Sequence, residues 1–291
     1  MEDYMIKVIT KDEDLIGIAC LTTGLVNEAR LRHGTFPTAT AALGRALTGA
    51  ELAASTLDPE QRVALKFEGN GPLRKIVVEA DGTGAVRGYV AAPETELPPR
   101  DGKLDVSGAL GRNGFLTVSK DLRLKDVYTG VVQLHSGEIA SDLAYYFSES
   151  EQVPTAVGLG VFVERDWHVS AAGGFMVQSL PSSDQERVES VIRHIERMDS
   201  VTAQIRDGKL PEDILGTIFE GIPFQVIEKR GLAFRCSCSR ERIEQAVISL
   251  GRREMEKLSE GSETLDISCQ FCGRVYTFSR QDIQRLLKEQ H

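Results

Sequence analysis

The hydrophobic and polar positions change their period along the chain, and this change predicts an α+β fold. Residues 4–20 have the mixed pattern of a strand or an extended segment. Segments 22–33 and 38–57 then repeat apolar residues at three- and four-residue intervals, which is the spacing of helices. Pro37 suits the start of the second helix, because the first helical turn needs no hydrogen bond from its nitrogen.

Short β-rich runs follow, separated by turn sequences such as Asp81-Gly82 and Asn113-Gly114. We expect strands at 63–67, 74–79, 86–90, 102–110, 114–119 and 127–134, a helix at 139–148, and strands at 155–164 and 167–178. Turns of this kind between consecutive strands indicate an antiparallel sheet joined by hairpins. The pattern therefore predicts an N-terminal domain of mixed helix and antiparallel sheet over residues 1–180.

The next segment becomes helical and highly charged. Ser183 and Glu186 have the spacing of a capping box, which predicts a helix that begins at Ser183. Further helical pieces are expected at 201–205 and 211–219. We therefore interpret residues 181–232 as a helical linker.

A small C-terminal unit is expected at residues 233–291. Its pattern predicts a helix at 240–258 and strand-like residues at 266–278, and Ser279 with Asp282 signals a last helix. Four of the five cysteines of the chain lie in this unit: Cys236, Cys238, Cys269 and Cys272.

These four cysteines have the arrangement of a structural zinc site. Such sites take four ligands in a tetrahedron, and two local pairs from different segments commonly supply them. Cys269 and Cys272 form a CxxC pair followed by Gly273, which helps the turn, and Cys236 and Cys238 are spaced more tightly. We predict that the four thiolates bind one Zn²⁺ ion. A closed set of sulfurs leaves no position for a water ligand, which argues against metal-assisted hydrolysis.

Zinc would supply much of the stability of so small a unit. Apparent zinc-binding energies are about 10 to 16 kcal/mol, whereas whole domains are stable by about 5 to 15 kcal/mol. Oxidation of the thiolates would therefore expel the metal and unfold the unit. Disulfides between neighbouring cysteines close such short loops that they would restore under about 2 kcal/mol. A longer bridge, such as Cys238 to Cys269, would stabilise the unit more and stays an alternative.

Composition and charge exclude several classes of protein. A hydrophobic fraction of 41% and a charged fraction of 26% are those of an ordinary globular protein. The formal charge of −9 disfavours non-specific binding to nucleic acid or to anionic membranes. The apolar runs are too short to span a bilayer, and the N-terminus lacks the pattern of a secretory signal. We expect a cytoplasmic protein without a membrane or nucleic-acid partner, in a reducing compartment that favours metal binding over structural disulfides.

The other candidate groups give weaker signals. Cys20 lies in an apolar segment, so we expect it to be a packing residue. The sequence contains no GxxxxGK[ST] phosphate-binding motif and no paired nucleophile and base. We therefore predict neither ATP use nor enzymatic activity.

Two rival functions fit part of the cysteine pattern. A zinc ribbon that binds nucleic acid normally has a basic face. Residues 233–291 contain ten Lys or Arg and nine Asp or Glu, and four thiolates with one Zn²⁺ bring the net charge to −1. A thiol oxidoreductase usually places its CxxC motif near a βαβ pattern, which this segment lacks.

Longer motifs resemble one known family along nearly the whole chain. They are GNGPLRKIVVEADGTGAVRGYV at 69–90, YTGVVQLHSGEIASDLAYYFSESEQVPTAVGLGVFV at 128–163, GGFMVQSLP at 173–181, and CSC with CQFC. In this order they are similar to those of the thirty-three-kilodalton redox-regulated heat-shock chaperone family.

The resemblance implies an ATP-independent holdase that is inactive while it is reduced and zinc-bound. Oxidant would pair Cys236 with Cys238 and Cys269 with Cys272, release the zinc, and expose a surface that binds unfolding client proteins. The family also suggests that the linker packs on the N-terminal sheet until the zinc unit unfolds, and that activation is coupled to formation of a homodimer. Under this interpretation residues 1–180 bind substrate and dimerise, and residues 233–291 form the redox switch.

Overall fold

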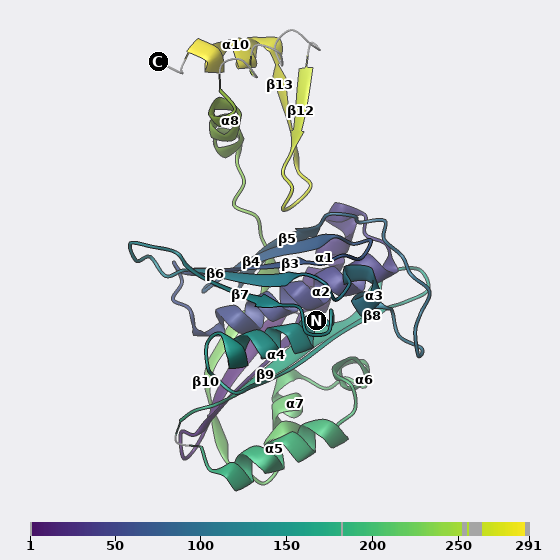
Figure 1. The fold of residues 1–291 in the computed structure, drawn as a ribbon, viewed down its shortest axis with the longest axis vertical. Helices are drawn as coiled ribbons and strands as arrows, with labels where there is room; N and C mark the ends of the chain where they lie inside the picture. Colours follow the sequence, from purple (N-terminus) through teal and green to yellow (C-terminus); the bar gives the residue numbers. More distant parts are fainter. Residues whose placement is uncertain (1, 182, 252–254, 256–263, 289–291) are drawn as a thin grey trace. The chain divides into compact units, whose positions relative to one another are not determined.

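The computed structural model describes residues 2–181, 183–251, 255 and 264–288. The chain divides into two compact units, Met1–Arg235 and Cys236–His291, which are considered separately (Figure 1). Within the described residues, no helix combines the length and the apolar character that crossing a bilayer requires. In the first unit, helices pack on two sheets whose strand pairs are almost all antiparallel, so the predicted α+β class is confirmed.

The first unit contains two sheets, a five-stranded and a six-stranded one. The five-stranded sheet has the order β10-β1-β2-β9-β8 and is antiparallel throughout. Its strands are β1 (Tyr4–Thr10), β2 (Leu15–Leu21), β8 (Thr155–Val163), β9 (Val169–Ser179) and β10 (Phe224–Gly231). The six-stranded sheet has the order β11-β5-β4-β3-β6-β7, with only the short β11 parallel to its neighbour. Its strands are β3 (Arg62–Glu68), β4 (Lys75–Asp81), β5 (Ala85–Val90), β6 (Phe115–Asp121), β7 (Tyr128–Gln133) and β11 (Ala233–Phe234).

Helix α2 (Pro37–Ala53) lies in the core between the two sheets, and it contacts strands of both. All of its residues except Arg45 are buried. Its many alanine and glycine residues permit this position: a Cβ atom at Gly44 would lie only 2.6 Å from Cγ1 of Val26. Val26 belongs to α1 (Thr23–His33), which packs against α2 together with α4 (Ile139–Glu149).

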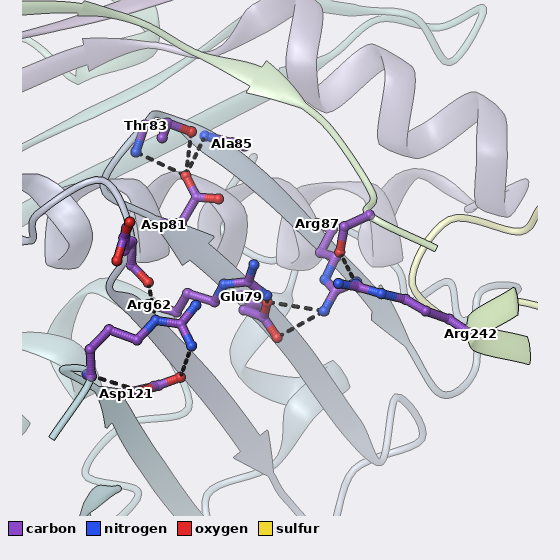
Figure 2. Close-up of polar contacts among 11 residues, drawn as sticks. Arg62, Glu79, Asp81, Thr83, Ala85, Arg87, Asp121 and Arg242 are labelled. Atoms are coloured by element: carbon purple, nitrogen blue, oxygen red, sulfur yellow. Dashed lines mark hydrogen bonds and ion pairs between the residues drawn. The ribbon is translucent and has the colours of Figure 1, made fainter. Parts of the chain in front are cut away.

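Charged side chains on the outward face of the six-stranded sheet form ion pairs across its central strands. Figure 2 shows Glu79 of β4 between two arginines. Its carboxylate accepts from Arg62 of β3 at 3.2 Å and from Arg87 of β5 at 3.0 Å. This face is polar on the strands at the centre of the sheet.

The outer face of the five-stranded sheet is apolar instead, and three helices cover it (Figure 1). They are α5 (Gln185–Arg197), α6 (Val201–Arg206) and α7 (Pro211–Ile218), and we call them the helical cover. The sheet contributes Ile6, Val8, Leu15, Ala19, Phe175 and Val177 to the buried cluster beneath it. The cover contributes mainly through α7 and the residue after it, with Ile214, Leu215, Ile218 and Phe219.

Three local predictions differ from the structure. Residues 106–110, the end of a predicted strand, form helix α3 (Val106–Leu110), because Asp105 caps it by accepting from the amide of Gly108 at 2.7 Å. Helix α5 has Asp184 as its N-cap, since the Ser183 hydroxyl donates to backbone carbonyls instead. The predicted linker also contains strand β10, whose pairing with β1 is a long-range contact that local pattern does not show.

Among its described residues, the second unit contains a β-hairpin and the two helices α8 (Arg240–Ser249) and α10 (Arg280–Lys288) around a small core. Strands β12 (Thr264–Ser268) and β13 (Val275–Ser279) pair in antiparallel fashion. The capping pair at the last helix is confirmed, because the Ser279 amide donates to Asp282 at 2.8 Å and the Asp282 amide donates back to the Ser279 hydroxyl at 3.2 Å. Residues 252–254 and 256–258 of the predicted helix at 240–258 lie outside the described residues.

Candidate metal centre

The structure brings the four cysteine sulfurs of the second unit into one cluster. All four Sγ atoms lie within 4.8 Å of one another. The Sγ atoms of Cys236 and Cys269 are 3.8 Å apart, and those of Cys238 and Cys272 are 3.4 Å apart. Sulfurs bound about 2.3 Å from a zinc ion at the corners of a tetrahedron would be separated by about 3.8 Å. The cluster therefore has the size and the donor atoms of a four-thiolate metal site.

The same distances describe reduced cysteines. A disulfide bond holds its sulfurs about 2.05 Å apart, and none of the five cysteines forms a disulfide in this structure. Both of these sulfur contacts join the Cys236–Cys238 segment to the Cys269–Cys272 segment. A metal bound here would therefore connect two parts of the chain that are more than thirty residues apart in sequence.

The CxxC segment is shaped by the turn that joins β12 to β13. The amide of Cys269 donates to the carbonyl of Arg274 at 2.9 Å, and the amide of Gly273 donates back to the carbonyl of Cys269 at 2.8 Å. Gly273 has a φ of 70°, a left-handed conformation that glycine adopts without steric cost. The turn thus holds Cys269 and Cys272 on the same side, and both are buried.

The other cysteine pair lies just before helix α8. Ser239 is the N-cap of this helix and accepts from the amide of Arg242 at 3.3 Å. The Arg242 guanidinium in turn donates to the hydroxyl of Ser237 at 2.6 Å. Because the N-terminal end of a helix favours negative charge, this position suits a thiolate at Cys238.

The electrostatic environment differs between the cysteines. Burial opposes ionisation of Cys238, but hydrogen bonds from the Tyr276 hydroxyl, 3.2 Å from its sulfur, and from neighbouring cysteines lower its pKa to about 7. Burial raises the pKa of Cys272 to about 12, and it also raises the pKa of Cys269. Four thiolates in one cluster therefore need a cation among them.

The sequence prediction missed Tyr276, which touches the cluster. Tyr276 lies in β13, four residues after Cys272, and its hydroxyl donates to the sulfur of Cys238 from the other segment. No spacing rule in the sequence indicates that contact, because it depends on how the hairpin meets the Cys236–Cys238 segment.

Cys20 is separate from the four-cysteine cluster. It lies in β2, its side chain is fully buried, and its thiol donates to the carbonyl of Gly174 at 3.7 Å. Burial raises its pKa above the usual range of a thiol. The prediction that Cys20 is a packing residue is confirmed by this burial.

Comparison with known proteins gives one consistent result. A family model described as Hsp33 protein matches residues 3–279. A 33 kDa chaperonin of Geobacter sulfurreducens is 53% identical over 98% of this chain and 94% of its own length. A 33 kDa chaperonin of Geobacter strain M21 is 48% identical over 99% of this chain and 98% of its own length.

The fold has a similar counterpart among solved structures. The crystal structure of a 33 kDa chaperonin from Thermotoga maritima, described as a heat shock protein 33 homologue, matches with a TM-score of 0.93. The two proteins are 37% identical, and the match covers 99% of each chain.

Proposed function

The chain belongs to the Hsp33 family of chaperones, and from this premise we propose that it is a redox-regulated, ATP-independent holdase. In the reduced state the four cysteines hold zinc and the protein is inactive. Oxidation forms disulfides, releases the metal, and unfolds the C-terminal switch and the linker. The activated protein then binds unfolding client proteins and prevents their aggregation.

We assign the metal site to Cys236, Cys238, Cys269 and Cys272, with one Zn²⁺ ion per chain. The ion would stabilise the thiolate form of all four sulfurs and connect the two segments that carry them. The family suggests that Cys236 pairs with Cys238 and Cys269 with Cys272 after oxidation. Formation of each disulfide passes two electrons from two thiolates to one molecule of hydrogen peroxide, whose O–O bond breaks and which takes up two protons from the solvent to become two water molecules.

The observation that carries this proposal is a four-thiol cluster in a unit with a very small core. The buried apolar side chains of that core, among the described residues, are Val247, Met255, Phe278, Ile283 and Leu286. A metal whose binding energy is about 10 to 16 kcal/mol would dominate the stability of such a unit. Loss of the thiolates therefore provides a direct route from an oxidant to local unfolding.

The second part of the proposal concerns the surface that becomes available. The helical cover lies on an apolar sheet face, as the family resemblance suggested for the linker. The cover follows residue 180 and ends at Ile218, and only β10 and β11 separate it along the chain from Cys236 of the switch. We propose that release of the cover exposes this face to unfolded chains, and that the activated form is a cytoplasmic homodimer without enzymatic activity.

The proposed function is tested by oxidising the zinc-loaded protein with peroxide under mild heating. We expect about one zinc per chain to be released, as measured with a chromogenic chelator. We expect the product, but not the reduced protein, to suppress light scattering by an unfolding client enzyme in the absence of ATP. Zinc release without any effect on client aggregation would refute the chaperone assignment. Binding to nucleic acid at physiological salt, measured in parallel, would support the zinc-ribbon alternative.

A further inference from the structure

One polar contact of the helical cover involves the strand that leads toward the cysteines. Glu212 of α7 accepts from the hydroxyl of Tyr4 in β1 at 2.5 Å and from the ammonium group of Lys229 in β10 at 3.0 Å. The Lys229 ammonium also lies 4.2 Å from the centre of the Tyr4 ring. These three side chains therefore tie one cover helix to two neighbouring strands.

The register of the sheet explains why the three residues meet. Lys229 pairs with Ile6, and directly paired residues point to the same face of an antiparallel sheet. Ile6 belongs to the apolar cluster beneath the cover, so Lys229 also points to that face. Tyr4 lies two residues before Ile6 and shares the face by strand alternation.

Glu212 takes part in this contact as a carboxylate. Burial alone would raise its pKa, but hydrogen bonds from Tyr4 and Lys229 hold the pKa below its usual value. The pKa of Tyr4 is raised by burial and by the neighbouring Glu212, so the phenol stays protonated and donates. Hydrogen bonds to a charged group are stronger than those between neutral groups.

The other two cover helices are fixed to different parts of the sheet. Arg187 of α5 pairs with Asp14, in the turn between β1 and β2, at 3.3 Å. Arg206 of α6 lies 4.0 Å from the ring centre of Phe162 in β8. Neither of these two contacts involves a residue of β10.

Strand β10 is the direct route along the chain from the cysteines to the cover. It forms an edge of the five-stranded sheet, and its only neighbour there is β1. After β10, the two residues of β11 pair with β5. One residue, Arg235, then separates β11 from Cys236. When the switch unfolds, β10 is therefore the first long element of the N-terminal unit next to the unfolded segment along the chain.

We propose that Tyr4, Glu212 and Lys229 form a coupling contact, which holds α7 in place until β10 leaves the sheet and then releases it. Detachment of β10 removes Lys229 from Glu212 and the pairing partner Gly231 from Tyr4. Helix α7 also holds α5, since His194 of α5 contacts the carbonyl of Ile218 at 3.0 Å. Loss of the Lys229 contact removes one polar attachment of α7, and through His194 it also weakens the support of α5.

This inference rests on the proposed function and predicts an interval between zinc release and client binding. The test uses full-length, zinc-loaded protein oxidised with peroxide under mild heating. Zinc release is followed with a chromogenic chelator, and client binding is followed by suppression of light scattering. We expect Glu212→Gln to shorten the interval by up to about fivefold, the factor that corresponds to about 1 kcal/mol, with the rate of zinc release unchanged.

Four further variants separate coupling from a general loss of structure. Glu220→Gln changes an exposed carboxylate close behind α7 and should keep the wild-type interval. Glu212→Lys should shorten the interval, and the double variant Glu212→Lys with Lys229→Glu should lengthen it again by restoring an ion pair. The single tryptophan, Trp167, lies in the N-terminal unit and reports whether each variant is folded. If Glu212→Gln does not fold, Tyr4→Phe removes only a hydroxyl and should shorten the interval.

The outcomes distinguish this inference from the proposed function. If oxidised wild-type protein binds no client, the proposed function is wrong. If wild-type protein binds client with no interval, or if Glu212→Gln and Tyr4→Phe both keep the wild-type interval, the coupling contact is refuted and the proposed function stands. Faster zinc release in Glu212→Gln would also refute it, because the residue would then act on the metal unit itself.

Discussion

The two faces of the five-stranded sheet are both buried, but the helices that cover them are held very differently. On the inner face, α2 buries every residue but Arg45 between two sheets. On the outer face, α5 buries Val191 alone and is otherwise partly or fully exposed. Because stability follows the apolar area removed from water, α2 belongs to the permanent core. The cover is the layer that we propose the sheet loses on activation.

The difference also explains where charged residues lie. The cover is attached through ionic and aromatic contacts such as Arg187 with Asp14 and Lys229 with Glu212, which lie at the rim of the apolar cluster. Partly exposed ion pairs of this kind contribute about 0 to 1 kcal/mol each. They fix the position of the helices on the sheet but add little to the free energy that holds them there.

The largest effect is expected from removing the metal ligands. Replacing Cys236, Cys238, Cys269 and Cys272 together with serine should abolish zinc binding and unfold the second unit, since about 10 to 16 kcal/mol of binding energy is lost. Metal content is measured by atomic emission, and structure by amide hydrogen exchange. The inner layer around α2 should keep its protection.

Cys20→Ala is the matched control for that experiment. It removes a buried thiol of the inner layer and should leave one zinc per chain in place. If the serine variant retains stoichiometric zinc, the ligand assignment is wrong. If Cys20→Ala loses zinc, the assignment of the site to the four clustered cysteines alone is also wrong.

The next effect is expected in the inner layer. Leu47 of α2 is fully buried, so Leu47→Ala should lower the free energy of unfolding of the N-terminal unit by about 2 to 5 kcal/mol. Urea denaturation followed by Trp167 fluorescence measures this, because the Trp167 ring lies 5.0 Å from Phe36 at the start of α2. Leu31→Ala, on the exposed side of α1, should cost less than about 0.5 kcal/mol. Equal losses at both positions would contradict the assignment of α2 as core.

A smaller, pH-dependent effect is expected at Glu51, a buried acid in α2. Its exposed fraction is 1%, and neither carboxylate oxygen has a hydrogen-bond partner among the described residues. Burial raises its pKa to about 8 from an ordinary 4.5, although Arg230 opposes the shift. The unfolded chain therefore releases this proton at lower pH than the folded protein. The contribution of Glu51 to the free energy of unfolding is therefore fully present below about pH 4.5 and is lost as the pH rises toward 8.

Glu51→Gln should remove this loss. Its free energy of unfolding should gain on the wild type by up to about 1.4 kcal/mol per pH unit between those two pKa values. Urea denaturation at several pH values measures the difference, and Glu220→Gln, at an exposed site, should show no such trend. Parallel pH profiles for Glu51→Gln and the wild type would show that Glu51 is not buried as an acid.

Local sequence pattern was sufficient for the elements whose partners are near in the chain. The hairpin turn at Asp81-Gly82 between β4 and β5, the helical spacing of α2, and the capping pair of Ser279 with Asp282 all depend on short-range chemistry, whereas Asn113-Gly114 joins helix α3 to β6 and forms no hairpin. The four cysteines could be assigned to one cluster because zinc coordination restricts ligand type and number.

The remaining features depend on contacts between distant segments. Strand β10 is extended because β1 offers it a free edge, and Tyr276 reaches Cys238 only through the folded hairpin. The α3 helix results from one aspartate cap in a segment that otherwise resembles a strand. The burial of Glu51 depends on two sheets that close over α2, and nothing in the flanking residues indicates it.

Amide hydrogen exchange before and after oxidation tests the contrast between the two faces most directly. After peroxide treatment with mild heating, the account predicts loss of protection in 185–231 and in the second unit, while 37–53 stays protected. Protection that persists in 185–231 after zinc release, or that is lost equally from 37–53, would contradict a removable outer layer on a permanent core.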